Sequence, residues 1–152
     1  VVPGITAALG AAASTGIPLT HRGVSRGVTL ITGSTREGLA EHHSPALSRL
    51  DHTLAVYMSV SHAGEIADRL IGGGLDPATP AAIVENATLP SERSVIGAVA
   101  DLAILVRDHA ITSPALLLIG DAVRPPQPSM RSSDSRRREP ASVAALALAI
   151  AD

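Results

Sequence analysis

Histidine pairs would indicate a metal site, a glycine-rich loop a phosphate site, and cysteine thiol chemistry. The sequence supports none of these three chemistries. The six histidines include the neighbours His42 and His43, which would point in different directions on any regular element, and no H-x-x-x-H or H-x-H pair occurs. We therefore predict no metal site. The glycines at 72–74 follow an expected helix, without the lysine of a phosphate loop, and are typical of a helix end. The absence of cysteine excludes thiolate catalysis and disulfides.

The bulk composition is that of a globular protein. The chain has 152 residues, of which 45% are apolar and 17% charged, so a packed core is expected. A net charge of -2 gives no reason to expect nucleic acid or an anionic membrane as a partner. No apolar run approaches the roughly 20 residues that span a bilayer, so we predict a cytoplasmic protein with no membrane partner. Tyr57 is the single aromatic residue, which leaves almost no platform for stacking bases.

The pattern of apolar and helix-breaking residues predicts strands that alternate with helices. Helices are expected at 5–15, ended by Gly16, at 61–71, with Ser61 as N-cap, and at 101–111. Runs of β-branched and apolar residues predict strands at 28–32, 53–58, 81–85, 93–99 and 114–119. The strand–helix–strand order from 53 to 85 favours a parallel crossover, and the short connection before 93 favours an antiparallel neighbour. The predicted fold class is α/β, with a mixed, mostly parallel sheet flanked by helices.

Two segments are expected to carry little regular structure. Residues 34–51 are polar and interrupted by Pro45, which predicts a loop with one helical turn. Residues 124–152 begin with a proline-rich stretch and continue with serine and arginine, so we predict a disordered tail. Within it, 143–150 could form a short helix.

Several short motifs occur in an order and at separations that resemble one family. They are Val-Pro-Gly-Ile-Thr-Ala at 2–7, Gly-Ile-Pro-Leu-Thr-His-Arg at 16–22, Val-Tyr-Met at 56–58 and Val-Glu-Asn-Ala-Thr at 84–88. Over residues 1–122 the chain is similar to the uroporphyrinogen-III C-methyltransferases of the tetrapyrrole methylase superfamily. The resemblance implies that this is the carboxy-terminal half of such an enzyme, with 1–24 as an interdomain turn and helix and 25–123 as the C-terminal α/β domain. It assigns no catalytic residue to this chain, because the family's glycine-rich loop and proposed acid–base residues belong to the other half.

The resemblance also implies a cofactor, S-adenosylmethionine, held in the cleft between the two domains. The positions that match the family's cofactor contacts are Thr6, Ala7, Met58, Ala87 and Ala115. Small side chains let the backbone approach an adenosyl group, and a thioether packs well on a ring. The alternative is that all five residues are core packing, but their common register with the family motifs favours the cofactor.

The substrate implied by the resemblance is uroporphyrinogen III, which is methylated twice to precorrin-2 on the way to sirohaem and cobalamin. Its eight carboxylates call for arginine, so we predict substrate contacts at Arg22, Arg26 and His21. The alternatives are an ion pair for Arg22 and a turn-stabilising role for His21.

Two other functions remain open from the sequence. The chain could belong to another precorrin or cobalt-precorrin methyltransferase, although the Pro-Leu-Thr-His-Arg motif at 18–22 argues against it. It could also be a non-catalytic fragment that associates with itself through exposed apolar surface. For the enzyme we expect a homodimer, and for the fragment alone no activity.

Overall fold

The computed structural model describes residues 1–36, 38–39, 47–48 and 51–124. The predicted tail and its short helix lie outside the described residues, apart from Arg124. Part of the predicted loop at 34–51 is described, and there a small antiparallel hairpin pairs β2 (Ser34–Thr35) with β3 (Gly38–Leu39). No helix within the described part of the chain is long and apolar enough to cross a membrane.

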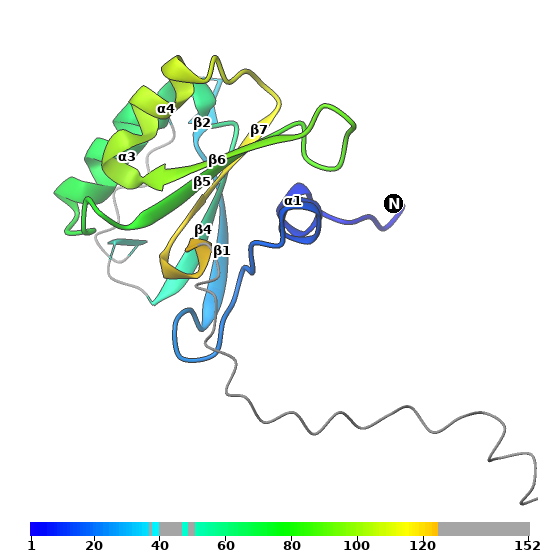
Figure 1. Cartoon of the computed structure of the whole chain (residues 1–152), viewed down its shortest axis with the longest axis horizontal. Helices are drawn as coiled ribbons and strands as arrows, with labels where there is room; N and C mark the ends of the chain where they lie inside the picture. The colour runs from blue at the N-terminus through cyan, green and yellow to red at the C-terminus, as the bar shows by residue number, and fades with distance from the viewer. Residues whose placement is uncertain (37, 40–46, 49–50, 125–152) are drawn as a thin grey trace, which may run out of the picture.

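A five-stranded mixed sheet forms the centre of the molecule (Figure 1). Its strands are β1 (Gly27–Thr32), β4 (His52–Tyr57), β5 (Pro80–Glu85), β6 (Arg93–Ala98) and β7 (Ala115–Ile119). They lie in the order β1-β4-β7-β5-β6. All five strands fall within two residues of the predicted runs, and the mixed α/β fold is confirmed.

The direction of the strands differs from the prediction in one respect. The strands β1 and β4 pair in parallel, whereas β4–β7, β5–β7 and β5–β6 are antiparallel, so the sheet is not mostly parallel when its neighbours are counted. The strands β4 and β5 do run the same way, as a crossover requires, but β7 lies between them. The predicted antiparallel pairing of β6 with β5 is confirmed.

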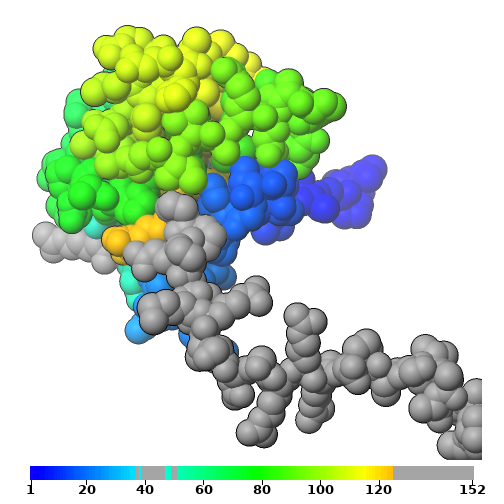
Figure 2. Space-filling model, in the orientation of Figure 1, coloured from blue at the N-terminus to red at the C-terminus, as the bar shows by residue number. Residues whose placement is uncertain are grey.

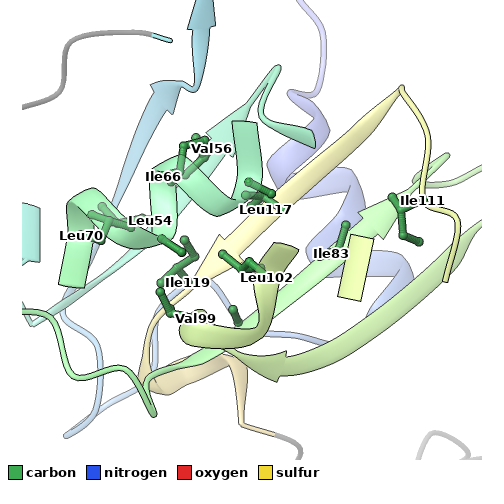
Figure 3. Close-up of a cluster of buried hydrophobic side chains, with 13 residues drawn as sticks. Leu54, Val56, Ile66, Leu70, Ile83, Val99, Leu102, Ile111, Leu117 and Ile119 are labelled. Carbon is green, nitrogen blue, oxygen red and sulfur yellow. The ribbon is translucent and has the colours of Figure 1, made fainter. Parts of the chain in front are cut away.

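One face of the sheet carries α3 (Ala63–Gly72) and α4 (Leu102–Asp108). Their buried side chains meet those of the central strands, as the close-up shows (Figure 3). Leu102 and Leu117 are fully buried there. This face is the larger core, and it fixes the positions of β4, β5 and β7 relative to one another.

The opposite face is covered by α1 (Ala7–Thr15), which lies across the sheet from α3 and α4 (Figure 1). Its Ala8 and Ala11 are fully buried against a second cluster that includes Leu116 and Leu118. Alanine allows the helix to approach the strands closely. The helix ends at Gly16, whose φ of 72° is the left-handed C-cap that the sequence predicts.

The predicted start of the second helix is wrong by two residues. A 3₁₀ turn (Val60–His62) precedes α3, and Ser61 lies inside this turn. The backbone N–H of His62 donates to the carbonyl of Ser59 at 3.0 Å, so the turn supplies the bonds that an N-cap side chain would otherwise make. The predicted end is confirmed, because α3 stops at Gly72 and Gly74 has a φ of 103°.

Candidate functional site

A pocket of about 420 Å³ opens at the edge of the sheet where β4 and β5 end and β7 begins. The strand β7 runs antiparallel to both neighbours, so its first residue, Ala115, lies beside Glu85, the last residue of β5. The start of α1 adds a further wall. The lining residues are Ala7, Tyr57, Met58, Val84, Asn86, Ala87, Leu89, Ser113, Pro114, Ala115 and Leu116.

The wall of the pocket is small, apolar and uncharged. Among the described residues that line it, none has a side chain charged at neutral pH. Ala7, Ala87 and Ala115 leave the backbone open to a bound molecule, and the Met58 side chain is 63% exposed at the rim. Such a wall suits an apolar or aromatic group held by van der Waals contact and main-chain hydrogen bonds.

The backbone turns sharply where the strands reach the pocket. Met58, directly after β4, has a φ of 49°, and Asn86, directly after β5, has a φ of 52°. Thr88 follows with a φ of 69°, which is uncommon for a β-branched residue. Left-handed backbone at non-glycine residues costs energy and persists only where the surrounding structure holds it. Such residues are found most often at binding and active sites.

Tyr57 joins the pocket to α1. Its hydroxyl accepts the backbone N–H of Ala8 at 2.9 Å and is hydrogen-bonded to the Thr6 hydroxyl. Thr6 stands at the N-cap position but makes no side-chain cap of its own, so the tyrosine supplies the cap from β4. The arrangement ties the first turn of α1 to the end of β4.

The loop between β5 and β6 extends past α1, and a second groove lies between them, beside the pocket. Figure 2 shows this loop, in green, above the blue amino-terminal segment. Glu92 accepts the Thr88 N–H at 2.5 Å, and a hydrogen bond from Ser14 of α1 is the first cause that keeps the pKa of Glu92 below its usual range. The groove, of about 890 Å³, shares Ala7 and Ala87 with the pocket.

Comparison with known proteins gives the family. The model for Tetrapyrrole (Corrin/Porphyrin) Methylases matches residues 1–103. The chain belongs to this family. The predicted family is confirmed, whereas the prediction that the chain is the carboxy-terminal half of its enzyme is not.

Relatives and solved structures of the family are similar over most of this chain. It is 46% identical to a siroheme synthase of Chromobacterium violaceum over 81% of this chain and 26% of the relative. It is 45% identical to a uroporphyrinogen-III C-methyltransferase of Pseudomonas aeruginosa over 82% of this chain and 50% of the relative. The uroporphyrin-III C-methyltransferase of Thermus thermophilus, solved in complex with S-adenyl homocysteine, superposes with a TM-score of 0.69 at 34% identity, over 81% of this chain and 50% of the other.

A cobalt precorrin-4 methyltransferase superposes with a TM-score of 0.74 at 30% identity, over 82% of this chain and 52% of the other. The chain therefore spans a quarter to a half of the length of these tetrapyrrole methylases.

The structure brings the five predicted cofactor residues of this tetrapyrrole methylase chain together. Ala7, Met58, Ala87 and Ala115 all line the pocket, although the four come from segments far apart in the sequence. Thr6 is bonded to Tyr57 at its edge and lines the adjoining groove. Their contact with a cofactor stays a prediction.

The three predicted substrate residues lie away from this pocket. They belong to the turn before β1, whose first residue pairs with His52 at the start of β4, whereas the pocket lies at the other end of β4. Arg26 pairs with Asp51, with 3.1 Å between Nε and Oδ2, and both side chains are exposed. His21 Nδ1 is 3.0 Å from the carbonyl oxygen of Arg22, which fits a turn-stabilising histidine. The substrate role of these residues stays a prediction.

A smaller pocket of about 250 Å³ lies at the same edge as that turn. His52 lines it, and its Nε2 is buried without a hydrogen-bond partner. Burial lowers the pKa of His52, while the nearby Asp51 opposes the shift. Among residues 1–36, 38–39, 47–48 and 51–124, no group of three or more histidine, aspartate or glutamate residues could hold a metal ion.

Sequence reasoning missed the residues that shape the pocket without resembling ligands. Tyr57 and Asn86 lie within the quoted motifs but were given no role. Ser113 and Pro114 precede Ala115 in the run that resembles the family and were given no role either, and Leu89 carries no signal of its own. Glu85 was missed for a different reason: its side chain is turned away from the pocket into a buried cluster of hydrogen bonds.

Proposed function

We propose that this chain forms the S-adenosylmethionine-binding wall of a uroporphyrinogen-III C-methyltransferase. The observation that carries the proposal is that Ala7, Met58, Ala87 and Ala115 line one pocket. The Thermus thermophilus relative, complexed with S-adenyl homocysteine, and the Pseudomonas aeruginosa relative, named for its substrate, support it.

The residues present fit the adenosyl part of this cofactor. An adenine ring needs flat apolar walls and main-chain groups for its polar edge. The side chains of Ala87 and Ala115 are small, so the backbone there is accessible. Asn86 adds an amide that can donate and accept. The exposed Met58 thioether is polarizable and can pack near a ring or a sulfonium.

When bound, S-adenosylmethionine would supply an electrophilic methyl group for attack by a ring carbon of the tetrapyrrole. This transfer needs alignment, exclusion of water and a proton acceptor afterwards. The pocket wall can align and exclude water, but among its described residues there is no carboxylate or imidazole to take the proton. We therefore expect the chain alone to bind the cofactor without transferring its methyl group.

A titration with S-adenosylhomocysteine tests the proposal. With alanine methyl groups labelled by ¹³C, we expect saturable shifts at Ala7, Ala87 and Ala115. Ala87→Leu should weaken binding about tenfold or more, because the added side chain occupies the pocket. The matched control is Ala100→Leu at an exposed position outside it, which should leave binding unchanged. Saturation without shifts at the three pocket alanines would refute this site.

The second part of the test concerns the substrate. A longer protein that contains this chain should transfer labelled methyl groups from S-adenosylmethionine to uroporphyrinogen III. Transfer to a cobalt precorrin instead would favour the alternative that the cobalt precorrin-4 methyltransferase neighbour represents. In that protein Arg22→Ala should raise the KM for the tetrapyrrole if this exposed arginine binds a carboxylate.

Self-association is a separate proposal, supported by the exposed apolar side chains of the first helix and the segment before it. Ile5 is 82% exposed and Leu9 is 54% exposed, and both line the groove beside the pocket. Exposed apolar surface of this kind favours an interface. Sedimentation should show a dimer that Leu9→Glu dissociates, and a monomer at all concentrations would contradict it.

A further inference from the structure

We infer that Glu85 is the positioning residue of the pocket: its buried carboxylate holds the two segments that form most of the wall at the spacing that the ligand requires. The inference rests on the proposed function, since the ligand is taken to be the adenosyl cofactor. Glu85 itself does not line the pocket and acts through its neighbours.

The carboxylate of Glu85 is almost completely buried and bonded on both oxygens. The residue is 2% exposed. The backbone N–H and the hydroxyl of Thr112 both donate to Oε1 at 2.7 Å. Arg93 donates to Oε2 from Nε at 2.7 Å and from Nη2 at 2.5 Å. Four donors on one carboxylate form a charge-assisted cluster, which we name the Glu85 clasp (Glu85, Arg93 and Thr112).

The clasp stands at the point where the pocket segments leave the sheet. Glu85 pairs in register with both Arg93 of β6 and Ala115 of β7. Immediately after Glu85, the segment 86–89 forms one side of the pocket, and immediately after Thr112, the segment 113–116 forms the other. With Val84, these two segments supply eight of the eleven lining residues. The hydrogen bonds between Glu85 and Thr112 join the points where the two segments begin, so they set the width of the pocket.

The clasp also reaches the helix that precedes the second segment. Arg93 donates to the carbonyl oxygens of His109 and Ala110, at 3.3 and 3.4 Å, just beyond the end of α4. The connection from α4 to β7 is thus held by side chains of β5 and β6. Hydrogen bonds from Thr112 are the first cause, and those from Arg93 the next, that keep the pKa of Glu85 below its usual range, so the carboxylate is ionised at neutral pH.

Only a carboxylate can satisfy all of these donors. In Glu85→Gln, one of the two oxygens becomes an NH₂ group. Where it faces Arg93 it meets two donors, and where it faces Thr112 it meets the backbone N–H, so one or two of the four hydrogen bonds are lost. The pocket segment on that side is then released. Thr112→Val removes the hydroxyl donor and keeps the shape of the side chain, whereas Thr112→Ser keeps the hydroxyl.

The experiment measures the Kd of S-adenosylhomocysteine for the chain and its variants, at a temperature where each is folded by circular dichroism. We expect Glu85→Gln to weaken binding about tenfold and Thr112→Val about threefold. Thr112→Ser should restore an affinity close to that of the parent. Glu65→Gln is the matched control, because Glu65 is an exposed carboxylate on α3, paired with His62.

A second readout separates this inference from the proposed function. In the free chain, the methyl signals of Ala87 and Ala115 should shift or broaden in Glu85→Gln and Thr112→Val and stay unchanged in Glu65→Gln. If the parent chain does not bind S-adenosylhomocysteine but these signals respond as expected, the clasp stands and the proposed ligand falls. If Glu85→Gln does not fold, Thr112→Val and Thr112→Ser decide. Unchanged affinity and unchanged signals in folded Thr112→Val would overturn the inference.

Discussion

Replacing Tyr57 by phenylalanine tests whether a hydroxyl on β4 caps the first helix. The substitution keeps the ring that lines the pocket and removes the hydroxyl that accepts the Ala8 N–H. The Thr6 hydroxyl loses its partner at the same time. Because Thr6 makes no side-chain cap of its own, the first turn of α1 is left with an unsatisfied donor.

The magnitude follows from the cap and its partial burial. Loss of a helix cap costs about 1 kcal/mol, within a range of about 0.5–2 kcal/mol. For a chain of this length that corresponds to a fall in Tm of about 2–4 °C. Thr6→Val removes the other hydroxyl of the pair and should cost about as much as one ordinary hydrogen bond, roughly 0.5–1.5 kcal/mol.

A double-mutant cycle by urea denaturation measures the coupling directly. If the two hydroxyls depend on each other, the double variant should be less destabilised than the sum of the single variants by about 0.5 kcal/mol or more. Thr20→Val, at an exposed position, is the control and should change the stability by less than about 0.5 kcal/mol. Additivity within about 0.3 kcal/mol would refute the coupling of the two hydroxyls, and an unchanged stability of Tyr57→Phe would refute the cap from β4.

Three further predictions concern the core, a close contact and pH. Leu117→Ala, at a fully buried position, should lower the free energy of unfolding by about 2–5 kcal/mol in urea, whereas Ile104→Ala, at an exposed position, should cost far less. Gly33→Ala should destabilise by about 1–3 kcal/mol in the same assay, because its new Cβ would lie 2.8 Å from the Cβ of Ser59. Burial lowers the pKa of His52, so the unfolded chain takes up a proton more readily than the folded one. The free energy of unfolding should therefore fall as the pH drops below about 6.5 towards the lower pKa of the folded state, and His52→Gln should flatten that part of the urea–pH curve.

The individual helices and strands were predictable from the sequence, because each is determined by residues that are neighbours in the chain. The strands at 52–57 and 115–119 contain the apolar runs 54–56 and 115–119, and the side chains at their centres are buried on both faces. The end of α1 follows from Gly16, whose left-handed backbone is easiest for glycine. The start of α3 was not predictable in the same way, since a 3₁₀ turn took over the role expected of Ser61.

The order of strands and the distance between motifs could not be predicted from local pattern. A hydrophobic run indicates that a segment is a strand, but it does not indicate which strand lies beside it. The position of β7 between β4 and β5 was therefore not predicted. Local pattern also does not state how far the predicted substrate residue Arg22 lies from the pocket. The register of β1 with β4 places the turn before β1 at the opposite edge of the sheet. Ala87 lies in the pocket because the residues beside it also determine where β5 ends, and its contact with a cofactor stays a prediction.

The central position of β7 has a consequence for how the chain reaches its folded state. During synthesis, the ladders β1–β4 and β5–β6 can form before residues 115–119 exist, yet each then presents an unpaired edge to solvent. The strand β7 must then enter between them and pair with β4, which is a long-range contact and therefore a slow step in kinetic terms. A nascent chain that stops short of Ala115 therefore has two separate parts of the sheet and no closed pocket. Its two unpaired strand edges are prone to aggregation.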